Sequence, residues 1–299
     1  GNDTDIDNGT TLTITSVQGA VNGTVALVGS NVVFTPAANY NGPASFTYTV
    51  SDGNGGTSTA TVTVNVAAVN DAPVAQAASF TVAEDAAVVN GAVTATDADA
   101  GATLTFALNG AAPAGLTFNS NGTYSFNPAN AAYQSLGVGQ STVITVPYTV
   151  TDNAGATSTA NLVITVTGTN DAPVAQAASF TVAEDAAVVN GTVTATDVDT
   201  GTTLSYALNG AAPAGLTFNS NGTYSFNPGN AAYQSLAAGQ STVITVPYTV
   251  TDNAGATSTA NLVITVTGTN DAPVAQAASF TVAEDAAVVN GSVIATDVD

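Results

Sequence analysis

The stretch NDAPVAQAASFTVAEDAAVVNG occupies residues 70–91 and returns letter for letter at residues 170–191 and 270–291. Around it, residues 71–170 and 171–270 align without a gap and differ at only nine positions. A period of 100 residues is far longer than the roughly 20 to 50 residues of solenoid repeats. Each period is therefore predicted to be a whole domain.

Apolar and polar residues alternate through each period, as in residues 78–84, where Phe80 and Val82 share one face. Similar segments follow at 87–96, 102–108, 115–120, 122–128, 141–150 and 156–168, with turn-forming residues between them. Seven short strands in about 100 residues are typical of an immunoglobulin-like sandwich. We therefore predict an all-β fold of tandem immunoglobulin- or cadherin-like seven-stranded β-sandwiches, arranged as beads on a string.

The repeat pattern also predicts the domain boundaries. Residues 1–70 are expected to be the C-terminal part of a related repeat, because Tyr48 and Asp52 match Tyr148 and Asp152 at an offset of one period. Residues 71–170 and 171–270 are two full repeats, and residues 271–299 are the first two strands of a further one. We expect the chain to be an excerpt whose ends fall within domains.

The charge balance excludes several functions. The 299 residues include 21 Asp or Glu and no Lys, Arg or His, which gives a formal net charge of −21. A chain without cations cannot bind phosphates, so nucleic acid is excluded as a partner. No apolar run approaches the roughly 20 residues of a membrane helix, so no membrane insertion is expected. With no His, Cys or Lys, only carboxylates could act as acid or base, and the chain is not expected to be an enzyme.

The carboxylates are confined to turns and to the linkers between repeats. Tracing the strands up and down the sandwich brings six of them to one junction: Glu84, Asp85, Asp171, Asp197, Asp199 and Asp252. Two like charges about 4 Å apart repel by roughly 1 kcal/mol in water, and by more near a protein surface. Because no Lys or Arg offsets them, a cation is predicted to bind at this junction.

The ligand chemistry selects the ion. Oxygen ligands without His or Cys favour Ca²⁺ over the transition metals, and Mg²⁺ fits less well because it tends to keep its waters. The alternative is that Asn-Asp, Asp-x-Asp and Glu-Asp are turn formers only. The segment DTDIDNG at residues 3–9 is not an EF-hand, but one more calcium within that loop is a further alternative.

Several motifs resemble a known family. TATDADAG (94–101) and VNDAPV (69–74) resemble the Asp-x-Asp and Asn-Asp calcium motifs of cadherin repeats. SDGNGGTSTATVTVNVAAVNDAPVA (51–75) is similar to the closing segment of cadherin-like repeats in bacterial surface proteins. AYQSL (132–136) and PYTVTDNAGATSTANLVITVTGTNDAPVA (147–175) look like VCBS repeats, which occur in very large secreted bacterial adhesins of the RTX type and in biofilm proteins.

The resemblance implies a secreted or bacterial cell-surface location, with calcium between the repeats. Asn170, Asp171, Asp197 and Asp199 would ligate it, together with Glu84 from the preceding repeat. A cadherin motif with Glu after Arg has no counterpart here, so the number of ions is not fixed. Over all copies, the candidate metal ligands are Asp3, Asp5, Asp7, Asp52, Asn70, Asp71, Glu84, Asp85, Asp97, Asp99, Asp152, Asn170, Asp171, Glu184, Asp185, Asp197, Asp199, Asp252, Asn270, Asp271, Glu284, Asp285, Asp297 and Asp299.

The leading hypothesis is a calcium-rigidified extender, or stalk, of a large secreted or cell-surface bacterial adhesin or biofilm matrix protein. Its partners would be adjacent repeats of the same chain. An alternative is an extracellular filament in which copies donate β-strands to one another. A third is a glycan- or surface-binding module in which Tyr124, Phe126, Tyr133 and Tyr148 line a sugar site, although such aromatic residues more often form a sandwich core.

Overall fold

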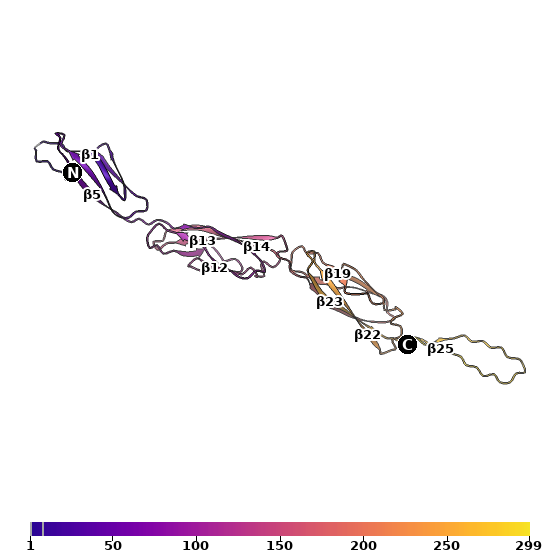
Figure 1. Ribbon diagram of the computed structural model, residues 1–299. Helices are drawn as coiled ribbons and strands as arrows, with labels where there is room; N and C mark the ends of the chain where they lie inside the picture. Colours follow the sequence, from indigo (N-terminus) through magenta and orange to yellow (C-terminus); the bar gives the residue numbers. More distant parts are fainter. Residues whose placement is uncertain (1, 8) are drawn as a thin grey trace. The chain divides into compact units, whose positions relative to one another are not determined.

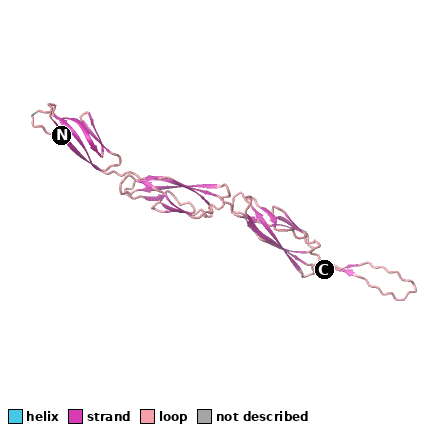
Figure 2. Ribbon diagram, in the orientation of Figure 1, coloured by secondary structure: helices cyan, strands magenta, loops and turns pink. Residues whose placement is uncertain are grey.

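The computed structural model describes residues 2–7 and 9–299, and this part of the chain contains strands, turns and loops but no helix (Figure 2). No helix there has the length and hydropathy needed to cross a membrane. The residues group into two compact units. The first runs to Phe80 and also includes Val89–Phe126 and Ile144–Ile164; the second consists of Thr81–Val88, Asn127–Val143 and Thr165–Asp299.

The second full repeat lies entirely in the second unit and has two main sheets. One has four strands in the order β16-β23-β22-β19, and the other has three in the order β17-β21-β20. A short pair, β15-β18, completes it. The strands are β15 (Val174–Ala175), β16 (Ala178–Ala183), β17 (Val189–Thr192), β18 (Ala195–Thr196), β19 (Ser205–Leu208), β20 (Leu216–Phe218), β21 (Thr223–Phe226), β22 (Ser241–Thr251) and β23 (Thr257–Thr267).

The pairing of these strands explains how the acidic turns are placed. β22 and β23 form a long antiparallel hairpin from Ser241↔Thr267 to Thr251↔Thr257, and they lie side by side in Figure 1. β16 pairs with β23 in parallel, from Ala178↔Leu262 to Ala183↔Thr267. The first strand of the repeat therefore ends where its last strand ends. The seven predicted strands are present, with the second divided into β17 and β18, and the short strand β15 precedes the first of them as an addition that the alternation did not predict.

The core of this repeat follows from the alternation along β22 and β23. Tyr248, Leu262 and Ile264 have no exposed surface and pack with Phe226 of β21. Across the sandwich, the rings of Phe180 and Tyr224 stack with centroids 5.8 Å apart. The all-β sandwich predicted from the sequence is confirmed.

The first full repeat has the same strands 100 residues earlier and contributes segments to both units. Its sheets have the orders β10-β13-β14-β7 and β11-β12-β8, with the short pair β6-β9. The strands are β6 (Val74–Ala75), β7 (Ala78–Ala83), β8 (Val89–Ala92), β9 (Ala95–Thr96), β10 (Thr105–Leu108), β11 (Leu116–Phe118), β12 (Thr123–Phe126), β13 (Ser141–Thr151) and β14 (Thr157–Thr167).

The aromatic residues considered for a sugar site belong to the core of this repeat. Tyr124 and Tyr133 expose 8% and 6% of their surface, and Phe126 and Tyr148 expose none. Side chains this deeply buried offer no platform on which a sugar ring could stack. The structure therefore gives the glycan-binding alternative no support from these residues.

The flanking segments contain fewer strands. Before the first full repeat, the chain forms the sheet β1-β4-β5 and the hairpin β2-β3. These strands are β1 (Thr13–Val21), β2 (Gly23–Val28), β3 (Asn31–Pro36), β4 (Gly42–Ser51) and β5 (Thr57–Val66). After the second full repeat, β24 (Val274–Ala275) pairs with β25 (Ala295–Thr296), and the residues between them are exposed.

Candidate metal site

Glu84 is placed by the end of the β7–β14 pairing. Its backbone N–H donates to the carbonyl of Thr167 at 3.0 Å, which continues the sheet beyond Ala83. The side chain has no exposed surface. Its Oε1 accepts a hydrogen bond of 2.9 Å from the backbone N–H of Thr169, and Thr169 Oγ1 donates to Asp85 at 2.7 Å. The acidic turn is thus tied to the linker that leaves its own repeat.

The linker in turn is tied to the following repeat. The backbone N–H of Asp171 donates to Oδ2 of Asp199 at 2.9 Å, and the N–H of Asp199 donates to Oδ1 of Asp197 at 2.9 Å. These bonds set the Asp-x-Asp turn against the linker. They also leave the second oxygen of each carboxylate free for another partner.

Glu84, Asp171 and Asp199 form a group, here called the central carboxylate cluster. Each offers one oxygen, and the three oxygens lie within 4.8 Å of one another. Glu84 is fully buried, and Asp199 exposes 7% of its surface. Nevertheless Glu84 Oε2, Asp199 Oδ1 and Asp171 Oδ2 are buried atoms without a hydrogen-bond partner. Buried polar atoms are normally paired. The three unpaired oxygens of this cluster could therefore hold a cation.

The electrostatics of the cluster agree with that interpretation. Burial raises the pKa of Glu84 above its ordinary value, although the backbone N–H groups of Thr169 and Leu136 oppose the rise. Burial also raises the pKa of Asp171, and the negative charges of Asp85, Asp199 and Asp197 raise it further. Without a counter-ion, ionisation of these carboxyls is therefore less favourable than for exposed carboxyls. A divalent cation would reverse that balance.

Asp252 has a different environment. Its Oδ1 accepts hydrogen bonds from the backbone N–H groups of Ala254 (2.8 Å) and Ala256 (2.9 Å), and its Oδ2 accepts one from Asn170 Nδ2 (2.7 Å). The bond from Asn170, followed by those from the backbone, lowers the pKa of Asp252. Asp252 therefore holds its own turn and orients Asn170. Asp152 does the same with Asn70, which donates to it at 2.7 Å.

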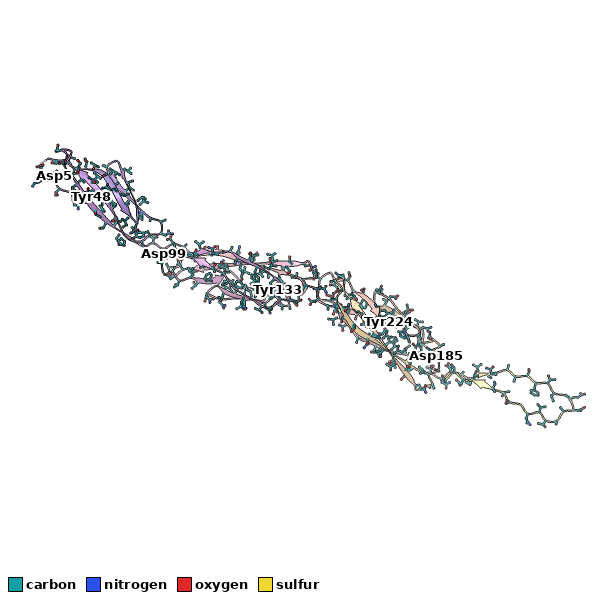
Figure 3. The ribbon with its side chains drawn as sticks, viewed as in Figure 1. Asp5, Tyr48, Asp99, Tyr133, Asp185 and Tyr224 are labelled. Carbon is teal, nitrogen blue, oxygen red and sulfur yellow. The ribbon has the colours of Figure 1, made fainter. Side chains whose placement is uncertain are left out.

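A second group repeats the arrangement 100 residues later. Glu184, Asp271 and Asp299 also place one oxygen each within 4.8 Å of one another. Glu184 is fully buried, and its Oε1 accepts from the N–H of Thr269 at 2.8 Å. Asp185, labelled in Figure 3, accepts from Thr269 Oγ1 at 2.6 Å. Asp271 donates from its N–H to Asp299 at 2.8 Å, and Asp297 accepts from the N–H of Asp299.

The junction before the first full repeat is less complete. Asp71 donates from its N–H to Asp99 at 2.8 Å, and Asp99 donates to Asp97 at 2.9 Å, as in the later copies. No buried glutamate joins them among the described residues, and they form no group of three like the two above.

Within residues 2–7 and 9–299, the remaining predicted ligands are not members of these groups of three. Asp5 accepts from the N–H of Asp7 at 2.8 Å, and Asp3 accepts from the hydroxyl of Tyr48 at 2.8 Å. Figure 3 labels Asp5 and Tyr48. Asp52 binds the N–H groups of its own turn. All of Asp3, Asp5 and Asp7 are exposed, as are Asn270, Glu284 and Asp285. In the described residues none of the N-terminal carboxylates joins a group of three.

The site also uses residues that the sequence did not single out. Thr169 and Thr269 hold both acidic side chains of the preceding turn through a backbone N–H and a hydroxyl. The loop at residues 132–140 supplies Ser135 and Gln140, which contact Thr200 of the next repeat. The invariant Gly-Thr-Asn-Asp at 168–171 and 268–271 was the available signal for the threonines.

Most of the chain matches the models of two bacterial domain families. The profile of the bacterial cadherin-like domain matches residues 70–168 and again 170–268. The profile of a bacterial Ig domain matches residues 1–65. None of the curated proteins compared with the chain matches it.

Solved structures share the fold at low sequence identity. Mouse cadherin-23 EC22-24 is 22% identical, with a TM-score of 0.55 over 88% of this chain and 89% of its own. PcdhgB3 EC1-4 is 18% identical, with a TM-score of 0.56 over 86% of this chain and 66% of its own. Protocadherin gamma B2 extracellular cadherin domains 1-5 are 17% identical, with a TM-score of 0.57 over 93% of this chain and 57% of their own.

Proposed function

The chain belongs to the bacterial cadherin-like domain family, and from this premise we propose that it is a calcium-stiffened extender of an extracellular bacterial adhesin or biofilm matrix protein. Bacterial Ig and bacterial cadherin-like domains typically have structural or adhesive roles. The near-identity of the two full repeats supports a spacer, because a spacer needs length and a defined joint rather than a distinct surface on each unit. Further copies of the chain in a matrix would be its partners beyond the adjacent repeats.

The observation that carries the proposal is the unpaired buried oxygens of the central carboxylate cluster. Burying an ionised carboxylate without a partner is costly, and here Glu84 and Asp199 are both more than nine-tenths buried with one oxygen unpaired. The chain has no Lys or Arg to pair with them. The residues present therefore fit a hard divalent cation bound by oxygen.

Calcium fits this donor set better than magnesium. Ca²⁺ accepts 6 to 8 oxygen ligands in flexible geometry, whereas Mg²⁺ demands a near-ideal octahedron and retains its waters. Glu84, Asp171 and Asp199 would hold the ion, and Asp197 offers a further buried oxygen, Oδ2, without a partner. When bound, the ion would supply the positive charge that the chain lacks. Each of the two repeats joined by this linker would then depend on the other for its ligands.

The protein's own contacts prepare the site. Thr169 directs Glu84, the N–H of Asp171 directs Asp199, and Asp252 directs Asn170. In that arrangement the acidic turn of one repeat, the linker and the Asp-x-Asp turn of the next are held as one unit. Rigidity at this joint is the property that an extender requires.

Calorimetric titration of the whole chain with Ca²⁺ and separately with Mg²⁺ tests the proposal. We expect Ca²⁺ to bind with higher affinity than Mg²⁺, and the triple variant Glu84→Gln, Asp171→Asn, Asp199→Asn to lose binding at one junction. If the triple variant binds as much Ca²⁺ as the original chain with the same affinity, the central carboxylate cluster is not a calcium site.

A further inference from the structure

The loop at residues 132–140, here called the junction loop, is fixed to its own repeat at both ends. Tyr133 is buried, with 6% of its surface exposed. At the other end, the carbonyl of Gln140 accepts a hydrogen bond of 2.9 Å from the N–H of Gly168. A Cβ on Gly168 would lie 2.0 Å from the carbonyl oxygen of Leu136, so only glycine lets the loop pack this closely against the linker.

The same loop reaches the Asp-x-Asp turn of the next repeat. The N–H of Thr200 donates to the carbonyl of Ser135 at 3.0 Å. The carbonyl of Thr200 accepts from Gln140 Nε2 at 3.3 Å. Both backbone polar groups of Thr200 are thus bound by the junction loop. Such pairing fixes the position of a turn more firmly than a single side-chain contact does.

Gly137 of the junction loop lies against Asp199. A Cβ built on Gly137 would be 3.6 Å from the Cβ of Asp199, which is ordinary van der Waals contact. Asp199 is buried, whereas its counterpart Asp99 in the preceding repeat is only half-buried. The backbone N–H of Leu136 donates to the carbonyl of Tyr133 at 3.2 Å and also lies near enough to Glu84 to lower the pKa of its carboxyl, against the rise that burial causes. The loop therefore contacts cluster carboxylates that come from two different repeats.

From these contacts we propose that the junction loop is a clamp that orients Glu84 and Asp199 toward each other before an ion binds, and so sets the calcium affinity of the joint. The inference rests on the proposed function, since it concerns the same carboxylates. Its physical basis is preorganisation. A site whose ligands already occupy the binding geometry loses less conformational freedom on binding, and the groups that orient metal ligands commonly change affinity by about 10- to 100-fold.

The pattern of sequence differences between the repeats points to the same contact. Of the nine differing positions, five lie in the loop or in the turn that it meets: 98/198, 100/200, 102/202, 137/237 and 138/238. Gly137 and Val138 line one hollow together with Thr200 and Thr202 of the turn. The loop of the second repeat has Ala237 and Ala238 in the places of Gly137 and Val138. Differences thus gather on the two sides of one contact in repeats that are otherwise nearly identical.

Gly137 offers a graded test with matched controls. Gly137→Ala adds a methyl group that fits, as Ala237 does in the second repeat. Gly137→Leu adds a side chain that has to displace Asp199 or the loop. Ala237→Leu makes the corresponding change in the second repeat, away from the central carboxylate cluster, and reports what a leucine at this loop position costs the sandwich itself.

The readout is the distance between spin labels placed on either side of the joint. The chain has no cysteine, so Thr145→Cys and Thr245→Cys, both at exposed positions, give two unique labels. Electron paramagnetic resonance then gives the width of the distance distribution at each free Ca²⁺ concentration, and thermal melting of each variant in EGTA reports folding. We expect Gly137→Leu to raise the Ca²⁺ midpoint at least about tenfold above that of Gly137→Ala, and to broaden the calcium-free distribution. Ala237→Leu should leave the midpoint unchanged.

The two possible failures are distinguishable. If the original chain narrows its distribution with Ca²⁺ but the three variants share its midpoint, the clamp is wrong and the calcium-stiffened joint stands. If Ca²⁺ leaves the original chain unchanged, the proposed function fails, and the calcium-free distributions decide on the clamp. A broader distribution for Gly137→Leu than for Gly137→Ala would then support only the orienting contact of the loop, with its role in calcium affinity overturned, and equal widths would overturn the contact as well.

Discussion

The backbone N–H of Asp171 donates a 2.9 Å hydrogen bond to Oδ2 of Asp199, which joins the linker to a turn 28 residues further along the chain. The same bond links Asp71 to Asp99 and Asp271 to Asp299, at 2.8 Å in each case. Because the bond uses one carboxylate oxygen and the backbone, it leaves Asp199 Oδ1 and the side chain of Asp171 for an ion. The linker and the Asp-x-Asp turn thus form the constant half of each junction.

Glu84 is the part of the central junction that comes from the preceding repeat. Glu84→Gln and Asp199→Asn should each weaken Ca²⁺ binding at the central junction by at least about tenfold, because each removes a charged ligand from a buried set. Calorimetric titration measures this loss. Glu284→Gln is the matched control, since Glu284 has the same sequence context but is exposed. An equal loss for Glu284→Gln would mean that the effect is not specific to the cluster.

The same Glu84→Gln variant should show the opposite effect on stability when calcium is removed. In EGTA the amide of glutamine places no third negative charge beside Asp171 and Asp199, while its carbonyl can still accept the hydrogen bond from Thr169. We therefore expect the variant to melt at the same temperature as the original chain or higher in EGTA, and lower in Ca²⁺. Differential scanning calorimetry of both proteins in EGTA and in Ca²⁺ tests whether the order of their melting temperatures changes in this way. A variant less stable in both would indicate that the carboxylate stabilises the repeat without an ion.

Calcium affinity should depend on pH in the mildly acidic range. The pKa values of Glu84 and Asp171 are raised in the ion-free chain. At a given mildly acidic pH, Glu84 and Asp171 therefore hold a proton more often than exposed carboxyls do, and Ca²⁺ has to displace that proton. Affinity should thus fall as the pH drops through the raised pKa values and level off above them. Titrations in two buffers of different ionisation enthalpy count the protons released, and release of none would contradict the prediction.

The raised pKa values of Glu84 and Asp171 also determine whether the stability of the calcium-free chain rises or falls with pH. A folded-state pKa above the unfolded value means that the folded chain binds more protons, so Glu84 and Asp171 favour folding below the ordinary carboxyl pKa and lose that effect as the pH rises through the raised one. Asp252 acts in the opposite sense because its pKa is lowered. Its contribution is present above the ordinary pKa and is lost as the pH falls through the lowered value. In the Asp252→Asn variant, the free energy of unfolding measured in urea should no longer contain the part that the original chain loses as the pH falls. If the variant and the original chain have the same free energy of unfolding at every pH, Asp252 does not stabilise its turn.

Gly168 should be required for the fold of the linker. Gly168→Ala would place a Cβ 2.0 Å from the carbonyl oxygen of Leu136 and 2.3 Å from that of Gly137. Because both obstacles are backbone atoms, we expect the free energy of unfolding to fall by about 1–3 kcal/mol. Gly110→Ala is the control, since a Cβ there meets nothing within 4 Å. Chemical denaturation of both variants measures the difference, and equal stabilities would refute the close packing of the junction loop.

Much of the fold could be predicted because the sequence pattern is local. Alternation along residues 241–251 and 257–267 places Tyr248, Leu262 and Ile264 on one face, and these are core residues. The position of acidic residues in turns also indicated that Glu84, Asp171 and Asp199 would meet. Because successive strands run up and down the sandwich, the direction of each strand is enough to predict which turns lie at the same end.

The rest depends on contacts that no local pattern encodes. Nothing in the alternation reveals that both oxygens of Asp252 are taken by its own turn and by Asn170. The junction loop has no periodicity, and Ser135, Gly137 and Gln140 carry no charge that would mark them. Only the differences between the two full repeats hinted at its role, because they gather where the loop meets Thr200.

Small-angle X-ray scattering of the chain in millimolar Ca²⁺ and then in excess EGTA shows whether calcium stiffens the joint. If calcium fixes the joint between repeats, the pair-distance distribution in Ca²⁺ should be that of a stiff particle, and chelation should make it shorter on average and more flexible while the sandwiches stay folded. Identical scattering in the two conditions would mean that calcium does not fix the joint and that the clustered carboxylates serve only to form turns.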